Sequence, residues 1–348
     1  MVKEGVSECA KNLVESSWAV STRNSYNSYI KRWAEYCEWK GISTTQASVT
    51  EGVNYLSHLF EQGEQYGYIA GTRSALSAIL PNVDGKTFGN QELVQRTLRG
   101  IYKLRPSFPR YLVIYDANIV LDYMRSLPSN KDLLLEVLTK KLVTLLCLLS
   151  GSRAQMVPAL DLHHMLVDPS GRYVFNIRQL IKTSKPGRHI APLEFWSFPH
   201  EKKLCVVDCL DEYITRTVSI RSDPVPKRTS VVPKRACLVP KRTSKPTKPT
   251  TPPKPLIVRF TTPFSPVGKA TIARYVKDFL GDAGIDVTVF TAHSTRSAST
   301  SLGSNMGMSF KDIAKAAGWW QESTFQKYYN KPIVTNLGCN ILRGNMKV

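Results

Sequence analysis

Apolar side chains recur at three- and four-residue intervals through the first third of the chain. Between residues 21 and 41 they form one face of a helix whose other faces are polar, and that apolar face consists of Tyr26, Tyr29, Ile30, Trp33, Tyr36 and Cys37. Ser21 is suited to cap the start of this helix and Gly41 to end it. Further helices are predicted at about residues 51–62, 70–79 and 90–102. We therefore expect a helical N-terminal domain over residues 1–105 and, at 106–111, a linker that contains two prolines.

From residue 112 onward, helical patterns alternate with short strand patterns. Strands are expected at 173–178 and 188–193, joined by the turn sequence KTSKPG, so the predicted sheet is small and antiparallel. Helices are expected at about residues 116–124, 132–149 and 208–218, then from 267 to an end at Gly281 or Gly284, and then on both sides of Gly318. The predicted fold class is a two-domain one: an all-α N-terminal domain and a mixed α/β domain over residues 112–348, mainly helical with a small antiparallel sheet.

The chain is strongly basic, with 47 lysines and arginines against 27 acidic residues and a net charge of +20. Residues 222–255 hold nine of the basic residues, nine prolines and three copies of the sequence VPKR, which predicts a disordered, extended insert within the second domain. The rest of the chain stays basic without this insert. The charge therefore indicates a polyanionic partner such as nucleic acid.

The sequence offers little support for several other classes of protein. No apolar run approaches the roughly 20 residues of a membrane span, so no membrane partner is expected. The seven scattered cysteines favour neither a disulfide framework nor a zinc site, and they fit a reducing, intracellular environment. Because no cluster of carboxylates or thiolates is visible, we expect no metal and no cofactor.

Basic side chains and tyrosines in the second domain have the chemistry that a phosphodiester requires. Two arginines distant in sequence, Arg153 and Arg296, can hold the two non-bridging oxygens of one phosphate. His293 precedes Arg296 by three residues, so both lie on one helical face. Lys182, at the base of the hairpin turn, can donate a proton, and a tyrosine near the C-terminus can act as a nucleophile. Each of these side chains alone is more often structural, so only the ordered set of all of them indicates a function.

That ordered set resembles the tyrosine recombinases of the phage-integrase family, and it looks closest to those of eukaryotic DIRS-type and Crypton elements. The resemblance lies in the fragments SGSRAQ, LIKTSKPGRH, FTAHSTRSAST and AAGWWQESTFQKYYNKP. The N-terminal fragments STRNSYNSYIKRW, TRSALSAI and LRGIYKLRPSFPRY are similar to that family's core-binding domain, which is helical and SAM-like. The likeness spans about residues 20–335 without the insert. It implies a site-specific DNA recombinase or integrase that works through a 3′-phosphotyrosyl intermediate without metal or ATP. The alternative is a catalytically inactive DNA-binding protein derived from a mobile-element recombinase.

The resemblance also implies a role for each matching residue. Arg153 and Arg296 would clamp the scissile phosphate, and Lys182 would be the general acid for the 5′-oxygen leaving group. His293 would take or share the proton of the nucleophile. Trp319, where many relatives have histidine, would donate its indole N–H to a phosphate oxygen.

Two positions depart from the pattern of many relatives. The nucleophile of bacterial and phage members lies nine residues after the position of Trp319, which is Tyr328, whereas the eukaryotic pattern places it ten residues after, at Tyr329. We expect Tyr329, with Tyr328 as the alternative. The acidic residue that often follows the first arginine by three is Met156 here, and Gln155 is expected to support Arg153 in its place.

Double-stranded DNA is the expected partner, bound by a homodimer, with a homotetramer in synapsis. The nucleus is the expected location, because the resemblance is eukaryotic and the insert carries Lys-Arg pairs. The expected DNA contacts are hydroxyl and basic residues at helix starts, on the 96–105 segment and on the hairpin, namely Thr22, Arg23, Lys31, Arg32, Thr72, Arg73, Arg96, Arg99, Lys103, Arg105, Lys185 and Arg188.

Overall fold

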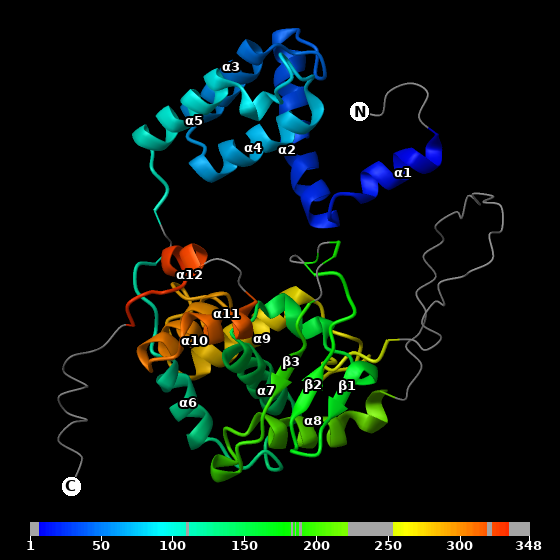
Figure 1. Ribbon diagram of the computed structural model, residues 1–348, viewed down its shortest axis with the longest axis vertical. Helices are drawn as coiled ribbons and strands as arrows, with labels where there is room; N and C mark the ends of the chain where they lie inside the picture. Colours follow the sequence, from blue (N-terminus) through cyan, green and yellow to red (C-terminus); the bar gives the residue numbers. More distant parts are fainter. Residues whose placement is uncertain are drawn as a thin grey trace. The chain divides into compact units, whose positions relative to one another are not determined.

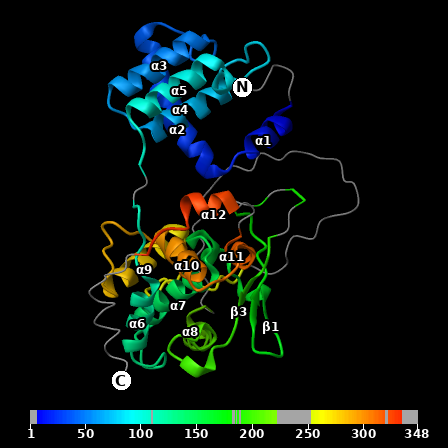
Figure 2. The same cartoon turned by 60° about the vertical axis from the view of Figure 1, so that its left-hand side comes forward.

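The chain divides into two compact units, which in the described residues are 7–108 and 111–333. The computed structural model describes residues 7–108, 111–181, 184, 186–187, 190–221, 253–318 and 322–333. Both units are drawn in Figure 1 and, turned, in Figure 2, and each is described by itself below. None of the described helices combines the length and the apolar character needed to cross a bilayer.

The N-terminal unit is helical, as the apolar spacing predicts. Its helices are α1 (Glu8–Ser16), α2 (Val20–Lys40), α3 (Val49–Glu61), α4 (Tyr66–Ile79) and α5 (Glu92–Leu104), with a short 3-10 turn at Phe88–Asn90. Helices α2 to α5 pack into one bundle (Figure 1) around a core that includes Trp33, Leu56, Ile69 and Leu98. Helix α1 contributes no buried residue.

The ends of α2 agree with the prediction at one terminus only. Gly41 ends the helix in the left-handed conformation, with φ 66°. Ser21 does not cap its start: the helix begins at Val20, and Ala19 is the residue that precedes it in extended conformation. The ring of Trp18 lies edge-on to Tyr26, 5.3 Å between centroids, and this packing accompanies the earlier start.

Helix α3 begins with a reciprocal capping box, in which each of two residues satisfies the backbone N–H of the other. Ser48 Oγ accepts from the N–H of Glu51 at 3.2 Å, and Glu51 Oε2 accepts from the N–H of Ser48 at 2.6 Å. These hydrogen bonds hold the pKa of Glu51 below its usual value.

Replacing Ser48 by alanine is expected to weaken the first turn of α3 by about 1 kcal/mol, because the backbone N–H of Glu51 loses its acceptor. The amides of that turn should then exchange with deuterium about fivefold faster. Hydrogen–deuterium exchange of the whole chain measures this, with Thr50→Ala as the control because Thr50 is an exposed first-turn residue outside the capping box. Equal exchange in the Ser48 variant and the wild type would contradict the prediction.

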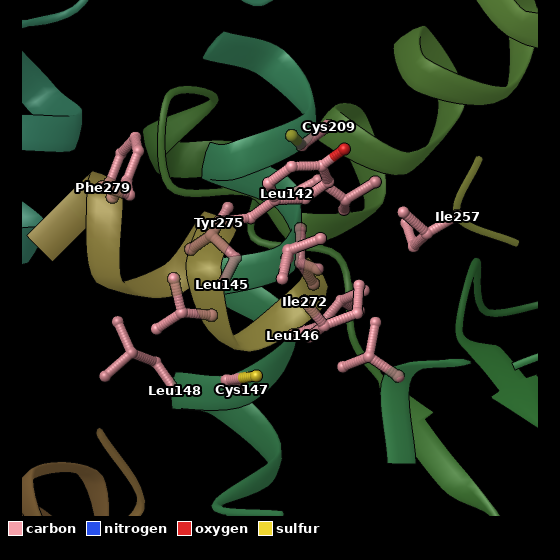
Figure 3. Packing of buried hydrophobic residues seen from close by; sticks show 14 of the residues in the cluster. Leu142, Leu145, Leu146, Cys147, Leu148, Cys209, Ile257, Ile272, Tyr275 and Phe279 are labelled. Carbon is pink, nitrogen blue, oxygen red and sulfur yellow. The ribbon is translucent and has the colours of Figure 1, made fainter. Parts of the chain in front are cut away.

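The second unit is built around α7 (Leu135–Ser150), which is apolar on nearly every face and buried accordingly. Helices α8 (Val206–Arg221) and α9 (Lys269–Asp282) pack against it, and Figure 3 shows Leu142, Leu145 and Leu146 of α7 beside the α9 side chains. The remaining helices are α6 (Ala117–Ser126), α10 (Ser294–Asn305), α11 (Phe310–Ala317) and α12 (Glu322–Tyr328), with 3-10 turns at Ala154–Ala159, Leu162–His164 and Pro199–Glu201.

The sheet is small and antiparallel, as predicted, but its strands differ from the predicted ones. It has the order β1-β2-β3, with β1 at Met165–Val167, β2 at Tyr173–Phe175 and β3 at Leu193–Phe195. The prediction missed β1, extended β2 to residue 178 and placed β3 at 188–193, of which residues 188 and 189 lie outside the described residues. Pro192 has no N–H for a ladder, and β3 begins directly after it. From there Leu193 and Phe195 alternate inward with the exposed Glu194.

The insert is anchored at both of its ends in the second unit. Arg221, the last residue of α8, donates from Nη1 to the carbonyl of Pro255 at 2.5 Å and from Nη2 to that of Leu256. Lys254 N–H donates to Asp161 Oδ2 at 3.1 Å. The predicted insert boundary of 222–255 is therefore too long at its C-terminal end, because Lys254 and Pro255 belong to the fold; residues 222–252 lie outside the described residues.

Candidate active site

The site begins where α7 ends and the chain turns toward Arg153. Gly151 ends the helix in the left-handed conformation, with φ 53°, and a Cβ there would approach Thr300 Cγ2 to 3.2 Å. Both the backbone conformation and the close contact therefore favour glycine at this position. Its carbonyl accepts a hydrogen bond of 2.9 Å from Arg296 Nη1. The end of α7 thereby holds a guanidinium that comes from the first turns of α10.

Arg296 is an unusual residue because its charged side chain is almost entirely inside the protein. It is 2% exposed. Its pKa is lowered to about 10, mainly by burial and then by the nearby like charge of Arg153, whereas Tyr329 raises the pKa. Arg153 and Arg296 line one cavity of about 70 Å³. The two arginines that are 143 residues apart in sequence thus lie together in the fold. An anion in this cavity would relieve both the burial cost and the mutual repulsion.

Tyr329 directly follows α12 and lies against both members of the His293–Arg296 pair. The Cζ atom of Arg296 is 5.1 Å from the centroid of the Tyr329 ring, and the His293 ring meets that ring edge-on at 5.9 Å between centroids. The backbone of Tyr329 is held as well, since its N–H donates to Phe325 and its carbonyl accepts from Ser301 Oγ at 2.8 Å. The side chain of Tyr328, in contrast, is 55% exposed.

Other expected residues of the site lie outside the described part of the chain. These are Lys182, Lys185, Arg188 and Trp319. Ile181 and Ile190, which precede and follow the hairpin turn in sequence, line the cavity that Arg153 and Arg296 share.

Gln155 is expected to support Arg153, but no hydrogen bond joins these two side chains among the residues that the structure describes. The Nε2 atom of Gln155 is buried, and it has no hydrogen-bond partner among the described residues. Met156 is 8% exposed and lines the cavity. The short 3-10 turn Ala154–Ala159 begins directly after Arg153 and buries Met156.

In the N-terminal unit, Thr72 is a correction to the expected DNA contacts. It is fully buried and its hydroxyl donates to the carbonyl of Tyr68, because α4 begins at Tyr66 and Thr72 lies in its second turn. Arg32 pairs with Glu64 at 2.6 Å, and Arg105 donates to the carbonyls of Glu64 and Phe60, so both guanidinium groups are used within the unit.

Of the other expected contacts in this unit, four are exposed and three are half-buried. Arg96, Arg99 and Lys103 recur at three- and four-residue spacing and form an exposed basic face of α5. Lys31 is exposed on α2, where Thr22 and Arg23 are half-buried. Arg73 is half-buried and donates to the carbonyl of Gly89 at 3.3 Å. The face on α5 is therefore the clearest candidate surface for a phosphate backbone in this unit.

Lys315, which is not among the expected site residues, also lines the cavity of the two arginines. The only sequence signal for it is its place on the helix that the Gly318 break ends. Across the residues that the structure describes, no group of three or more histidine, cysteine, aspartate or glutamate side chains is placed to hold a metal ion.

No protein-family model matches this chain, and neither does any curated protein. Solved structures do match. A XerH site-specific recombinase bound to palindromic difH substrate, in a post-cleavage complex, has a TM-score of 0.52 at 12% identity over 88% of this chain and 75% of that one. The Tn1549 transposon integrase in complex with transposon right-end DNA has a TM-score of 0.50 at 11% identity over 87% of this chain and 86% of that one. A lambda integrase dimer bound to a COC′ core site has a TM-score of 0.48 at 16% identity over 92% of this chain and 74% of that one.

These matches define the class of fold. The chain has the fold of the tyrosine recombinases and integrases, with a helical N-terminal unit and a mainly helical second unit that carries a small antiparallel sheet.

Proposed function

We propose that this protein is a tyrosine-type, site-specific DNA recombinase or integrase. The observation that carries the proposal is the position of Tyr329, whose ring lies against the Arg296 guanidinium and the His293 ring beside the cavity that Arg153 lines. A phosphodiester bound by the two arginines would place its phosphorus next to a tyrosine hydroxyl. That arrangement suits nucleophilic attack on the phosphorus.

The proposed reaction conserves the number of phosphate ester bonds at each step. The Tyr329 Oη attacks the phosphorus, a bond from Oη to phosphorus forms, and the bond to the 5′-oxygen breaks. His293 takes the phenol proton, and Lys182 gives a proton to the departing 5′-oxygen. The product is a 3′-phosphotyrosyl enzyme and a free 5′-hydroxyl. A 5′-hydroxyl from a partner strand then attacks the same phosphorus and releases the tyrosine, so neither ATP nor a metal enters the proposed cycle.

Electrostatic stabilisation is the main contribution of the arginines in this scheme. Arg153 and Arg296 bind the non-bridging oxygens, on which negative charge develops, and Trp319 donates its indole N–H to one of them. Because Arg296 is already buried and held by the Gly151 carbonyl, its guanidinium needs little reorganisation when the phosphate binds.

The proposal extends to the partners and the setting. Double-stranded DNA is bound in part by the basic face of α5 that Arg96, Arg99 and Lys103 form. Two copies bind inverted half-sites and four form the synapse. A nuclear location fits the Lys-Arg pairs of the VPKR copies, and the sequence fragments around Arg153 and Tyr329 favour an origin in a DIRS-type or Crypton-type element.

A suicide-substrate experiment tests the proposal. The protein is incubated with a pool of random-sequence duplexes, each nicked so that the short 5′-hydroxyl fragment leaves after cleavage and the covalent intermediate accumulates. The expected result is a protein–DNA adduct that resists SDS and is destroyed by protease. Retained DNA binding without any adduct would overturn the enzymatic proposal and favour a binding protein that has kept the fold.

A further inference from the structure

Lys315 is a third basic residue beside the two arginines, and the proposed reaction does not use it. It lies on α11, one turn before the helix ends at Gly318, and its side chain is exposed. It lines the cavity of Arg153 and Arg296, and it also lines a second hollow of about 230 Å³. The two hollows share Lys315, its neighbour Ala316 and the segment Ala191–Leu193, so Lys315 stands between them.

The second hollow contains two carboxylates that could compete for the Lys315 ammonium. Glu194 accepts a hydrogen bond of 3.0 Å from Arg172 Nη1, and Asp312 accepts one of 2.6 Å from Ser309 Oγ. Both carboxylates thus have partners of their own. Among the residues that the structure describes, Lys315 forms no ion pair. Its ammonium therefore remains available to an anion on the arginine side.

The arginine cavity has the size and the charge for a single anionic group. Its volume of about 70 Å³ is well below the roughly 300–1,000 Å³ of sites that enclose whole small molecules. Arg296 is desolvated there and is repelled by Arg153, and Lys315 adds a third positive charge at the rim. A group whose negative charge is shared by two oxygens, such as a backbone phosphate, can accept hydrogen bonds from all three cations at once.

We propose that Lys315 is a third cationic contact to the DNA phosphate that Arg153 and Arg296 hold. This inference rests on the proposed function and adds a residue to it. The Lys315 ammonium binds a phosphate oxygen in the ground state, and the interaction strengthens as negative charge builds on the oxygens during attack.

The test compares Lys315→Gln with Lys311→Gln in the full chain. Lys311 lies one turn earlier on the same helix, is exposed and lines neither hollow, so it is a matched control for loss of one charge. The first measurement is the affinity for a random-sequence duplex across a salt series. The slope of log Kobs against log salt should decrease in magnitude by about 0.9 in Lys315→Gln, which is the value for one lost phosphate contact. The slope of Lys311→Gln should equal that of the wild type.

The second measurement is single-turnover adduct formation on the nicked duplexes. Lys315→Gln should be slower by about tenfold or more, and Lys315→Arg should recover most of the rate. Wild-type values of both slope and rate in Lys315→Gln, or equal losses in Lys311→Gln, would overturn the assignment. The affinity measurement does not depend on cleavage. If the wild type forms no adduct, the recombinase proposal fails. If Lys315→Gln nevertheless shows the smaller slope and Lys311→Gln does not, the phosphate contact of Lys315 stands.

Discussion

Tyr329→Phe is expected to abolish the covalent protein–DNA adduct, whereas Tyr328→Phe is expected to leave it in place. The phenylalanine ring can still pack against Arg296 and His293, so the variant loses the attacking oxygen and little else. Because loss of a nucleophile costs an enzyme about 10⁴-fold or more in rate, no adduct should be detectable. Tyr328 is 55% exposed, and its replacement removes no contact that the proposed reaction uses.

The measurement is adduct formation on the nicked duplexes, followed by protease digestion and mass spectrometry of the peptide that carries the nucleotide. DNA binding by both variants, measured by fluorescence anisotropy, is the control for folding. An adduct in Tyr329→Phe together with none in Tyr328→Phe would reverse the assignment of the nucleophile.

Arg296→Gln is expected to slow cleavage by about 10²- to 10³-fold, the loss that follows removal of one preorganised charge donor. The same change should leave the stability of the protein unchanged or raise it, because the wild-type side chain is buried and repelled by Arg153. Most substitutions of buried residues have the opposite effect on stability. A buried arginine that lowers the stability of the folded protein is expected to serve the proposed reaction.

Thermal unfolding and single-turnover cleavage measure the two effects. Arg216→Gln is the matched control, since Arg216 also donates to a backbone carbonyl, that of Leu133 at 2.6 Å, but lies on α8 and lines no part of the arginine cavity. That variant should lose stability and keep cleavage. A drop in stability of Arg296→Gln by more than about 1 kcal/mol would show that the guanidinium is structural instead.

Local sequence signals predicted the elements that carry the site better than they predicted its long-range contacts. The three-residue spacing of His293 and Arg296 is enough to place both at the start of one helix, and Gly41 ends α2 as its flexibility suggests. Thr72 was misplaced because Gln65, which precedes α4, provides no side-chain cap, so nothing in the sequence marks the true start of that helix.

Contacts between residues distant in sequence lay beyond periodicity and propensity. Arg105 binds carbonyls 41 and 45 residues away, and Arg32 pairs with a glutamate 32 residues away. No local pattern distinguishes such arginines from ones that face DNA. The approach of Arg153 to Arg296 was expected from the family resemblance alone, and β1 is only three residues long, too short for its alternation to stand out.

Because residues 221 and 254–256 are anchored in the second unit, the number of residues between them has little effect on the stability of the fold. Because Arg221 and Asp161 fasten both ends of the intervening stretch, doubling the number of residues between them costs the folded state only about 0.6 kcal/mol. Copies of the VPKR sequence, which begin seven residues apart at 225, 232 and 239, can then be added or removed at little cost to folding. The same position is a natural place to graft a reporter or an affinity tag without disturbing the rest of the polypeptide.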